Sequence, residues 1–263
     1  MKLHTIRVAP AIALTAMIAA GAFLLPTIRS IGEETPAAPP STPAATATPA
    51  PATPAPKRMA VKISYKAPPG SLGVATSREG GGTRGAGDAL PALYVLAPEH
   101  VAMTTKAQPV LFWFQGQPAK AALEVTLTEP KKPKPLLSVK LEKADKAGIR
   151  ALSLAQHNVT LEPGIEYRWS VSLVPDASNR SKDKFASGVI KRIPTPSGLD
   201  EKTEAASKAE AAALYAQSGL WYDALQSISE AITQDPSDAS LHQMRAALLT
   251  QGKLAEVAKA ETK

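Results

Sequence analysis

The chain has 263 residues, of which 44% are hydrophobic and 20% are charged, a composition that excludes both a wholly disordered chain and a bundle of membrane helices. Cysteine is absent, which excludes disulfides, thiolate zinc sites, a catalytic cysteine and lipid attachment to cysteine. The net charge of +7 is uneven: residues 1–60 carry +3, residues 61–198 carry +8 and residues 199–263 carry −4. A basic middle and an acidic end indicate two modules with different surfaces.

Residues 1–25 are predicted to be a secretory signal peptide or a membrane anchor. Lys2 and Arg7 stand before or at the start of an apolar run that extends from Val8 to Leu25. As a helix, this run has a length of about 27 Å, close to the thickness of a bilayer core. Small residues at 20–22 permit cleavage, but a mature chain would then begin with Phe-Leu-Leu, so both readings stay open. In either case we expect the segment to contact the membrane with its N-terminus in the cytoplasm.

Residues 26–60 are predicted to be a disordered tether. The stretch 35–56 contains 8 Pro, 8 Ala, 5 Thr and 1 Ser, and no apolar side chain larger than alanine. Such a composition cannot form a core and favours extended polyproline II segments. We expect the tether to hold a folded domain away from a membrane, in an exported protein that is periplasmic or anchored to the inner membrane.

The fold is predicted to be mainly β, with a β-sandwich of seven or eight strands over residues 61–198. Apolar and polar residues alternate over 121–127, 137–141 and 167–173, which is typical of half-buried antiparallel strands. Val110 to Phe114 is continuously apolar and suits a central strand. Further strands are expected near 61–65, 92–97, 148–154 and 185–193, separated by proline and glycine clusters.

One local pattern favours an immunoglobulin-like or fibronectin type III-like sandwich. The sequence Leu161-Glu162-Pro163-Gly164-Ile165-Glu166-Tyr167 comes directly before an alternating strand. In such sandwiches a tyrosine at the start of strand F forms a hydrogen bond back to the preceding corner. Tyr167 is predicted to be that tyrosine, which indicates the fold and nothing about function.

Residues 199–263 are predicted to be a small helical unit. Helices are expected near 203–218, 221–234 and 239–250, in a stretch rich in Ala, Glu, Lys, Gln and Leu. The spacing resembles part of a tetratricopeptide repeat, through Gly219, Trp221, Ala224, Ala231 and Pro236. About one and a half repeats bury little surface, so we expect this unit to pack on the sandwich with Trp221 near the seam.

Several short motifs in a fixed order give a family resemblance. They are Gly80-Gly81-Gly82-Thr83-Arg84-Gly85, Leu96-Ala97-Pro98-Glu99-His100, Leu111-Phe112-Trp113-Phe114, Leu161-Glu162-Pro163-Gly164 with Tyr167-Arg168-Trp169, Arg180-Ser181-Lys182-Asp183, and Gly219-Leu220-Trp221-Tyr222-Asp223-Ala224-Leu225. Over residues 61–258 the chain resembles the bacterial domain-of-unknown-function family 928. The resemblance implies an extracytoplasmic protein of unknown role, with the C-terminal helices in the same unit, and it supplies no catalytic residue.

The sequence contains no motif for catalysis or for a cofactor. The glycine stretch 80–87 lacks the Gly-Lys-Ser/Thr ending of a phosphate loop, and no Gly-x-Ser-x-Gly elbow is present. The four histidines do not pair at metal-ligand spacing. The candidate site residues are Arg84, Arg180, Lys182 and Asp183 for a ligand, and Trp221 and Tyr222 for a protein partner. For these two aromatic residues the competing interpretation is burial at the seam.

These features favour a non-enzymatic protein that binds or scaffolds an envelope or membrane protein. One alternative is a glycan- or anion-binding module that uses the basic face of the β-domain. A second is a hydrolase with an unrecognised site. Nucleic-acid binding is disfavoured, because the basic charge lacks interleaved aromatic residues and the leader directs the chain out of the cytoplasm.

Overall fold

The computed structural model describes residues 61–69, 77–82, 90–141, 143 and 145–262. The predicted signal or anchor at 1–25 and the tether at 26–60 lie outside the described residues. No helix in the described part of the chain is long and apolar enough to cross a membrane. The described residues all belong to one compact unit, Pro56–Lys263, so the sheets and the helices can be discussed together.

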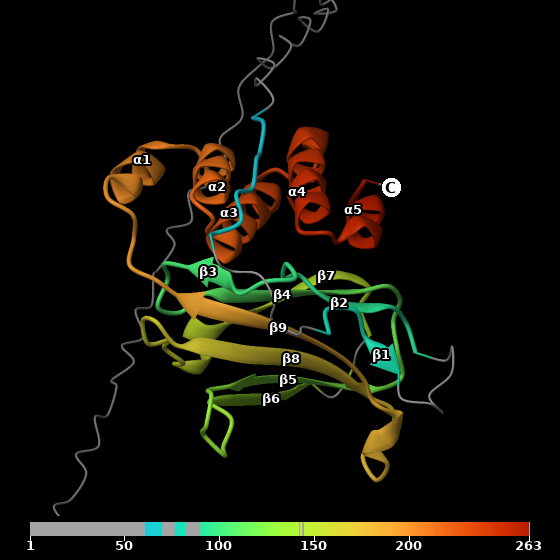
Figure 1. Ribbon diagram of the computed structural model, residues 1–263. Helices are drawn as coiled ribbons and strands as arrows, with labels where there is room; N and C mark the ends of the chain where they lie inside the picture. Colours follow the sequence, from blue (N-terminus) through green and yellow to red (C-terminus); the bar gives the residue numbers. More distant parts are fainter. Residues whose placement is uncertain (1–60, 70–76, 83–89, 142, 144, 263) are drawn as a thin grey trace, which may run out of the picture. The chain divides into compact units, whose positions relative to one another are not determined.

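The described strands form two sheets (Figure 1). The larger sheet has the order β1-β9-β8-β5-β6, and β3 pairs in parallel with β9. Its strands are β1 (Gly81–Gly82), β3 (Ala102–Thr104), β5 (Ala122–Thr128), β6 (Leu137–Leu141), β8 (Glu166–Val174) and β9 (Lys184–Arg192). The smaller sheet has the order β2-β4-β7, made of β2 (Leu93–Val95), β4 (Val110–Gln115) and β7 (Gly148–Ser153).

The alternation in the sequence decides which side chains fill the space between the sheets. Leu123, Val125 and Leu127 of β5 are buried, while the residues between them are half-buried. Trp169 of β8 is fully buried and lies opposite Gly188 of β9. A Cβ at Gly188 would come within 2.8 Å of the Cβ of Ala97, so glycine lets the chain pack closely here. Most of the buried hydrophobic residues of both sheets belong to one hydrophobic cluster.

The predicted corner is confirmed. The hydroxyl of Tyr167 accepts a hydrogen bond from the backbone N–H of Glu162 at 3.1 Å, and the Tyr167 ring is buried. Gly164 makes the intervening turn with a φ of 82°, a value that side-chain-bearing residues rarely adopt. The side chain and the turn together fix how the chain enters β8.

Five helices follow in the described part of the chain: α1 (Leu199–Ala205), α2 (Lys208–Gln217), α3 (Trp221–Gln234), α4 (Ala239–Gln251) and α5 (Ala255–Glu261). The single helix predicted over 203–218 is wrong. The chain breaks at Ser207, whose side chain accepts from the Glu210 N–H while the Glu210 carboxylate accepts from the Ser207 N–H. This capping box starts a new helix. Helix α5 was not predicted.

Two further expectations are corrected. The described chain has about as many residues in helices as in strands, so it is mixed α/β rather than mainly β. The segment near 61–65 is not a strand, because it pairs with no other strand and lies against the helices instead.

The helices join the sheets through three consecutive residues at the start of α3. The indole N–H of Trp221 donates to the Leu96 carbonyl at 2.8 Å. The hydroxyl of Tyr222 accepts from the Trp169 indole at 2.8 Å. The carboxylate of Asp223 accepts from the N–H of Thr105 at 3.1 Å and from its hydroxyl at 2.8 Å. One buried cluster therefore contains residues from both the helices and the sheets.

Candidate functional site

A groove between α2 and α4 holds an extended piece of the chain itself. Residues 61–66 run along it, drawn in cyan in Figure 1. The side-chain amide of Gln251, at the end of α4, accepts from the Tyr65 N–H at 2.7 Å and donates to the Ile63 carbonyl at 3.3 Å. On the α2 side, the Lys66 N–H donates to the Ala216 carbonyl at 3.1 Å. We call residues 61–66 the groove segment.

The groove segment turns alternate side chains toward the helices. Ile63 is buried, Val61 and Tyr65 are half-buried against the same cluster, and Lys62, Ser64 and Lys66 are exposed. Alternate side chains are therefore buried, as they would be in the strand expected near 61–65, but they pack on helices. The extended conformation is right, and the predicted strand pairing is replaced by contacts with α2 and α4.

Tyr65 lies in an aromatic socket, formed by His100 and Trp221. Its ring stacks on His100 with a centroid distance of 5.8 Å and meets Trp221 edge-on at 5.0 Å. The Tyr65 hydroxyl and His100 Nε2 are 2.7 Å apart. Burial raises the pKa of Tyr65 well above its usual value. Burial, helped by the positive charge of Arg78 and opposed by Glu99, lowers the pKa of His100, which favours the neutral imidazole in this pair.

Glycine and an ionic network support the socket. A Cβ at Gly252 would lie 2.2 Å from Cη2 of Trp221, so only glycine lets the chain pass beneath that ring. Arg78 donates to the Gly252 carbonyl at 2.9 Å and pairs with Glu99 at 2.6 Å. Lys253 pairs with the other oxygen of Glu99 at 2.7 Å. The hydrogen bond from Lys253, followed by the charge of Arg78, lowers the pKa of Glu99.

Two cavities adjoin the first residue of the groove segment. The larger, about 770 Å³, lies among Val61, Glu210, Gln234, Asp238 and Met244 and other residues of α2, α3 and α4. The smaller, about 520 Å³, borders Val61 on the side of α1 and α2 and includes Ala206 and Leu214. Both cavities therefore share Val61 with the groove segment.

Three of the four residues predicted to bind a ligand lie in one loop, where neighbouring side chains balance their charges. Arg180 donates to both carboxylate oxygens of Glu124, at 3.1 and 2.7 Å, and to Asp183 at 2.7 Å. Lys182 pairs with Asp176 at 3.3 Å. The structure thus brings Arg180, Lys182 and Asp183 together, but their charges are balanced by neighbouring carboxylates. Arg84, the fourth predicted ligand residue, lies outside the described residues.

The two residues predicted to bind a partner protein lie at the seam, where the helices contact the sheets. Trp221 and Tyr222 have exposed fractions of 0% and 1%. Neither ring is accessible to a partner, so the exposed partner-binding interpretation is wrong for this fold. Their polar atoms face the sheets, where backbone and Trp169 groups satisfy them. Burial of both rings is what fixes the helices against the sheets.

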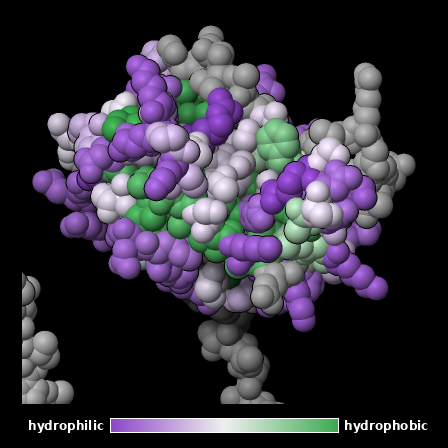
Figure 2. Space-filling model, turned by 90° about the horizontal axis from the view of Figure 1, so that it is seen from below, coloured by the Kyte–Doolittle hydropathy of each residue, from purple (hydrophilic) through white to green (hydrophobic). Residues whose placement is uncertain are grey.

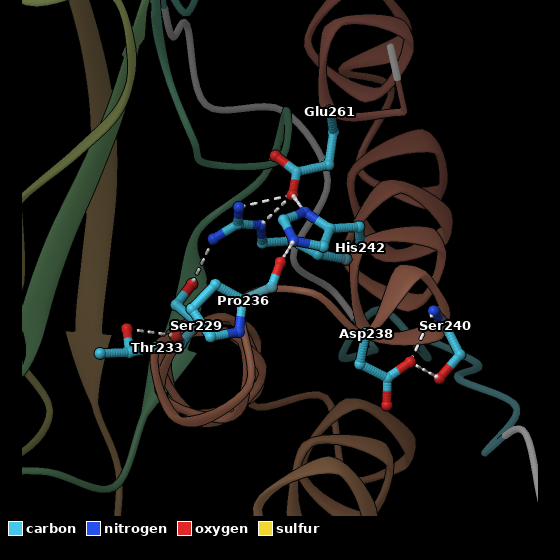
Figure 3. Close-up of polar contacts among 8 residues, drawn as sticks. Ser229, Thr233, Pro236, Asp238, Ser240, His242 and Glu261 are labelled. Atoms are coloured by element: carbon cyan, nitrogen blue, oxygen red, sulfur yellow. Dashed lines mark hydrogen bonds and ion pairs between the residues drawn. The ribbon is translucent and has the colours of Figure 1, made fainter. Parts of the chain in front are cut away.

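A cluster of polar side chains on α4 and α5 holds helices together (Figure 3). Nδ1 of His242 is 2.7 Å from the Glu261 carboxylate, and Nε2 is 3.1 Å from the Pro236 carbonyl. Arg245 donates to the same carboxylate and to the hydroxyl of Ser229 at 3.2 Å. Both ring nitrogens of His242 are thus engaged by acceptor groups, and the cluster links α5 to α4 and α3.

Outside the groove, the surface of the described residues has fewer features of a binding site. On the face opposite the helices, hydrophobic residues show in patches bordered by hydrophilic ones (Figure 2). The large hydrophobic side chains that are exposed in the described part are Leu136 and Phe185. No group of three or more His, Cys, Asp or Glu side chains within the described ranges could hold a metal ion.

The groove depends on residues that sequence reasoning did not select. Gln251 gave no signal, because a glutamine at a helix end is common. For Tyr65 the sequence predicts only a position in the strand expected near 61–65. Two family motifs do meet at the socket: His100 ends the Leu96–His100 stretch, and Trp221 belongs to the Gly219–Leu225 stretch.

The comparisons with solved structures are weak. Astrotactin-2, described as a conserved vertebrate-specific and perforin-like membrane protein involved in neuronal development, aligns over 66% of this chain and 36% of its own, with 11% identity and a TM-score of 0.26. A multi-domain immunophilin from Arabidopsis thaliana aligns over 66% of this chain and 93% of its own, with 10% identity and a TM-score of 0.16. The chain spans about a third of the Astrotactin-2 structure, and neither likeness carries an argument about the fold.

The sequence comparisons are more informative. No curated protein matches the chain. The sequence model of the family described as Domain of Unknown Function (DUF928) matches residues 79–262, which contain the sheets, the seam and all five helices. The chain therefore belongs to the DUF928 family.

Proposed function

We propose that this protein is a non-enzymatic interaction module of the cell envelope, which binds a segment of a partner protein on its helical unit. The observation that carries the proposal is the groove between α2 and α4, where an extended segment already lies and two cavities of about 770 and 520 Å³ adjoin it. Concave sites of this size are typical binding sites, and the larger cavity is lined by about as many polar as apolar residues.

The proposed fold of each part agrees with this role. The strand orders β2-β4-β7 and β9-β8-β5 are those of strands A, B, E and G, F, C in an immunoglobulin-like or fibronectin type III-like sandwich. The first residues of α3 and α5, Trp221 and Ala255, are spaced by one tetratricopeptide repeat, about 34 residues. Both folds serve as interaction scaffolds in many proteins, and this analogy supports the proposed role.

The proposed location comes from the sequence. The charged start and apolar run of residues 1–25 are those of a signal or anchor, and the Pro/Ala/Thr stretch after it has the composition of a spacer. A reporter that is active only outside the cytoplasm, fused after residue 60, is expected to be active. A stable but inactive fusion would contradict export.

Photo-cross-linking of the intact protein in its own cells tests the interaction. A photoreactive amino acid at Gln234, exposed at the larger cavity, should form a discrete cross-link to one partner, which mass spectrometry then identifies. The matched control is the same amino acid at Ser138, exposed on β6 of the distant sheet. Equal cross-linking from both positions, or none from Gln234, would refute the proposed function.

A further inference from the structure

The groove holds an extended chain mainly by its backbone. In an extended chain the Ile63 carbonyl and the Tyr65 N–H point to one side and the Lys66 N–H points to the other. Gln251 pairs with the first two, as a neighbouring strand would, and the Ala216 carbonyl takes the third. Gln251 is itself fixed by a bond from its amide to the Ala247 carbonyl at 3.0 Å. A peptide of any sequence can form backbone hydrogen bonds of this kind if it has the same extended conformation.

Side-chain selection comes from alternate positions. The helices bury Ile63 and half-bury Val61 and Tyr65, while the residues between them face away. The aromatic socket distinguishes tyrosine from phenylalanine, because the hydroxyl of Tyr65 reaches His100 Nε2 at 2.7 Å. A peptide that fits the groove therefore has five consecutive residues that match positions 61–65: an apolar residue, any residue, an aliphatic residue, any residue and a tyrosine.

We infer that the groove is a recognition site for extended segments of partner proteins with this pattern, and that residues 61–66 occupy it as an intramolecular pseudo-ligand. The inference rests on the proposed function and specifies its ligand class. The groove segment belongs to no sheet, and Val61 is in the lining of both cavities.

Binding of a synthetic peptide to the full chain tests the inference. The probe is a fluorescein-labelled peptide with the sequence of residues 58–68. Against the wild-type chain it competes with a segment at an effective concentration on the order of millimolar, so binding should be weak. Tyr65→Ala in the full chain weakens the competitor and should tighten peptide binding by about tenfold or more. The control is Lys62→Ala, an exposed side chain of the same segment, which should leave binding unchanged.

The peptide itself supplies the specificity controls. Replacing its tyrosine with phenylalanine should weaken binding several-fold through loss of the His100 contact, and a scrambled peptide without the alternation should not bind. Gln251→Ala in the Tyr65→Ala chain should abolish binding. Equal binding of the scrambled peptide, or no binding to a Tyr65→Ala chain that keeps its circular dichroism spectrum, overturns the inference.

Hydrogen exchange provides a test that needs no variant. Excess unlabelled peptide should raise deuterium uptake in residues 61–66 of the wild-type chain, because displacement exposes the Tyr65 and Lys66 N–H groups. Unchanged uptake at peptide concentrations that saturate the groove would overturn displacement. The two proposals fail separately: peptide binding without a cross-linked partner refutes the proposed function alone, and a cross-linked partner without peptide selectivity refutes the ligand class alone.

Discussion

Gly252→Ala tests the socket through a single methyl group. The new Cβ would lie 2.2, 2.8 and 3.0 Å from three atoms of the Trp221 ring, all well inside van der Waals contact. The backbone of Gly252 has a φ of −77°, so alanine introduces no conformational strain there. The variant therefore isolates the steric effect of one methyl group on a buried indole.

The expected effect is destabilisation. In a compatible backbone conformation, Gly→Ala stabilises a protein by about 0.4–1 kcal/mol through the unfolded state. Overpacking a filled site costs about 1–3 kcal/mol, and the buried, hydrogen-bonded Trp221 ring has no free space to enter. We expect a net loss of about 1–2 kcal/mol, which lowers the melting temperature by about 2–8 °C for a unit of this size.

Urea unfolding of a double-mutant cycle with Trp221→Phe is the assay. The smaller ring lacks the atoms that the new methyl group would contact, so the penalty of Gly252→Ala should largely disappear in that background, a coupling of about 1 kcal/mol or more. Gly116→Ala, whose Cβ would lie 3.3 Å from the Cβ of Ala92, a tight contact that a shift of a few tenths of an ångström relieves, is the control and should cost clearly less than Gly252→Ala. Additive effects of Gly252→Ala and Trp221→Phe would refute the steric reasoning.

Two other variants and a division of the chain test the fold. Tyr167→Phe removes the hydroxyl that accepts from the Glu162 N–H and should cost about 1–3 kcal/mol; an unchanged urea midpoint would argue against the corner. Burial raises the pKa of the Asp223 carboxyl group above its ordinary 3.8. Between 3.8 and the raised pKa the folded state binds more protons than the unfolded state, so the free energy of unfolding falls as the pH rises through this range. Asp223→Asn should remove this fall, and urea midpoints of both proteins measured from pH 4 to pH 7 should diverge; parallel profiles would contradict it. Residues 61–198 and 199–263 expressed separately should each lose cooperative melting, because they share one buried cluster; two independent cooperative transitions would refute the shared core.

The candidate site shows where sequence reasoning stops. Val61, Ile63 and Tyr65 alternate as a strand would, and period two is a property of any extended chain with one buried face. The sequence could not tell whether that face meets a sheet or a pair of helices. The groove residue Gln251 is 186 positions from Tyr65, and no local pattern links them.

The charged run illustrates the opposite failure. Arg180, Lys182 and Asp183 are neighbours in sequence and invited a ligand-binding interpretation. Glu124, which neutralises Arg180, is 56 positions away on β5. Whether a surface charge is available to a ligand depends on partners that folding brings beside it, and these are invisible in the local sequence.

The sequence by itself determined the elements whose signals are local. Alternation placed β5, β6 and β8, the corner residues placed the start of β8, and the ordered motifs identified the family. Tertiary structure decided the rest: that Trp221, Tyr222 and Asp223 face the sheets, that Gly252 passes beneath an indole, and that residues 61–66 lie in a groove. The physical reason is that propensity and periodicity act between near neighbours, whereas the groove is built from contacts between segments far apart in the chain.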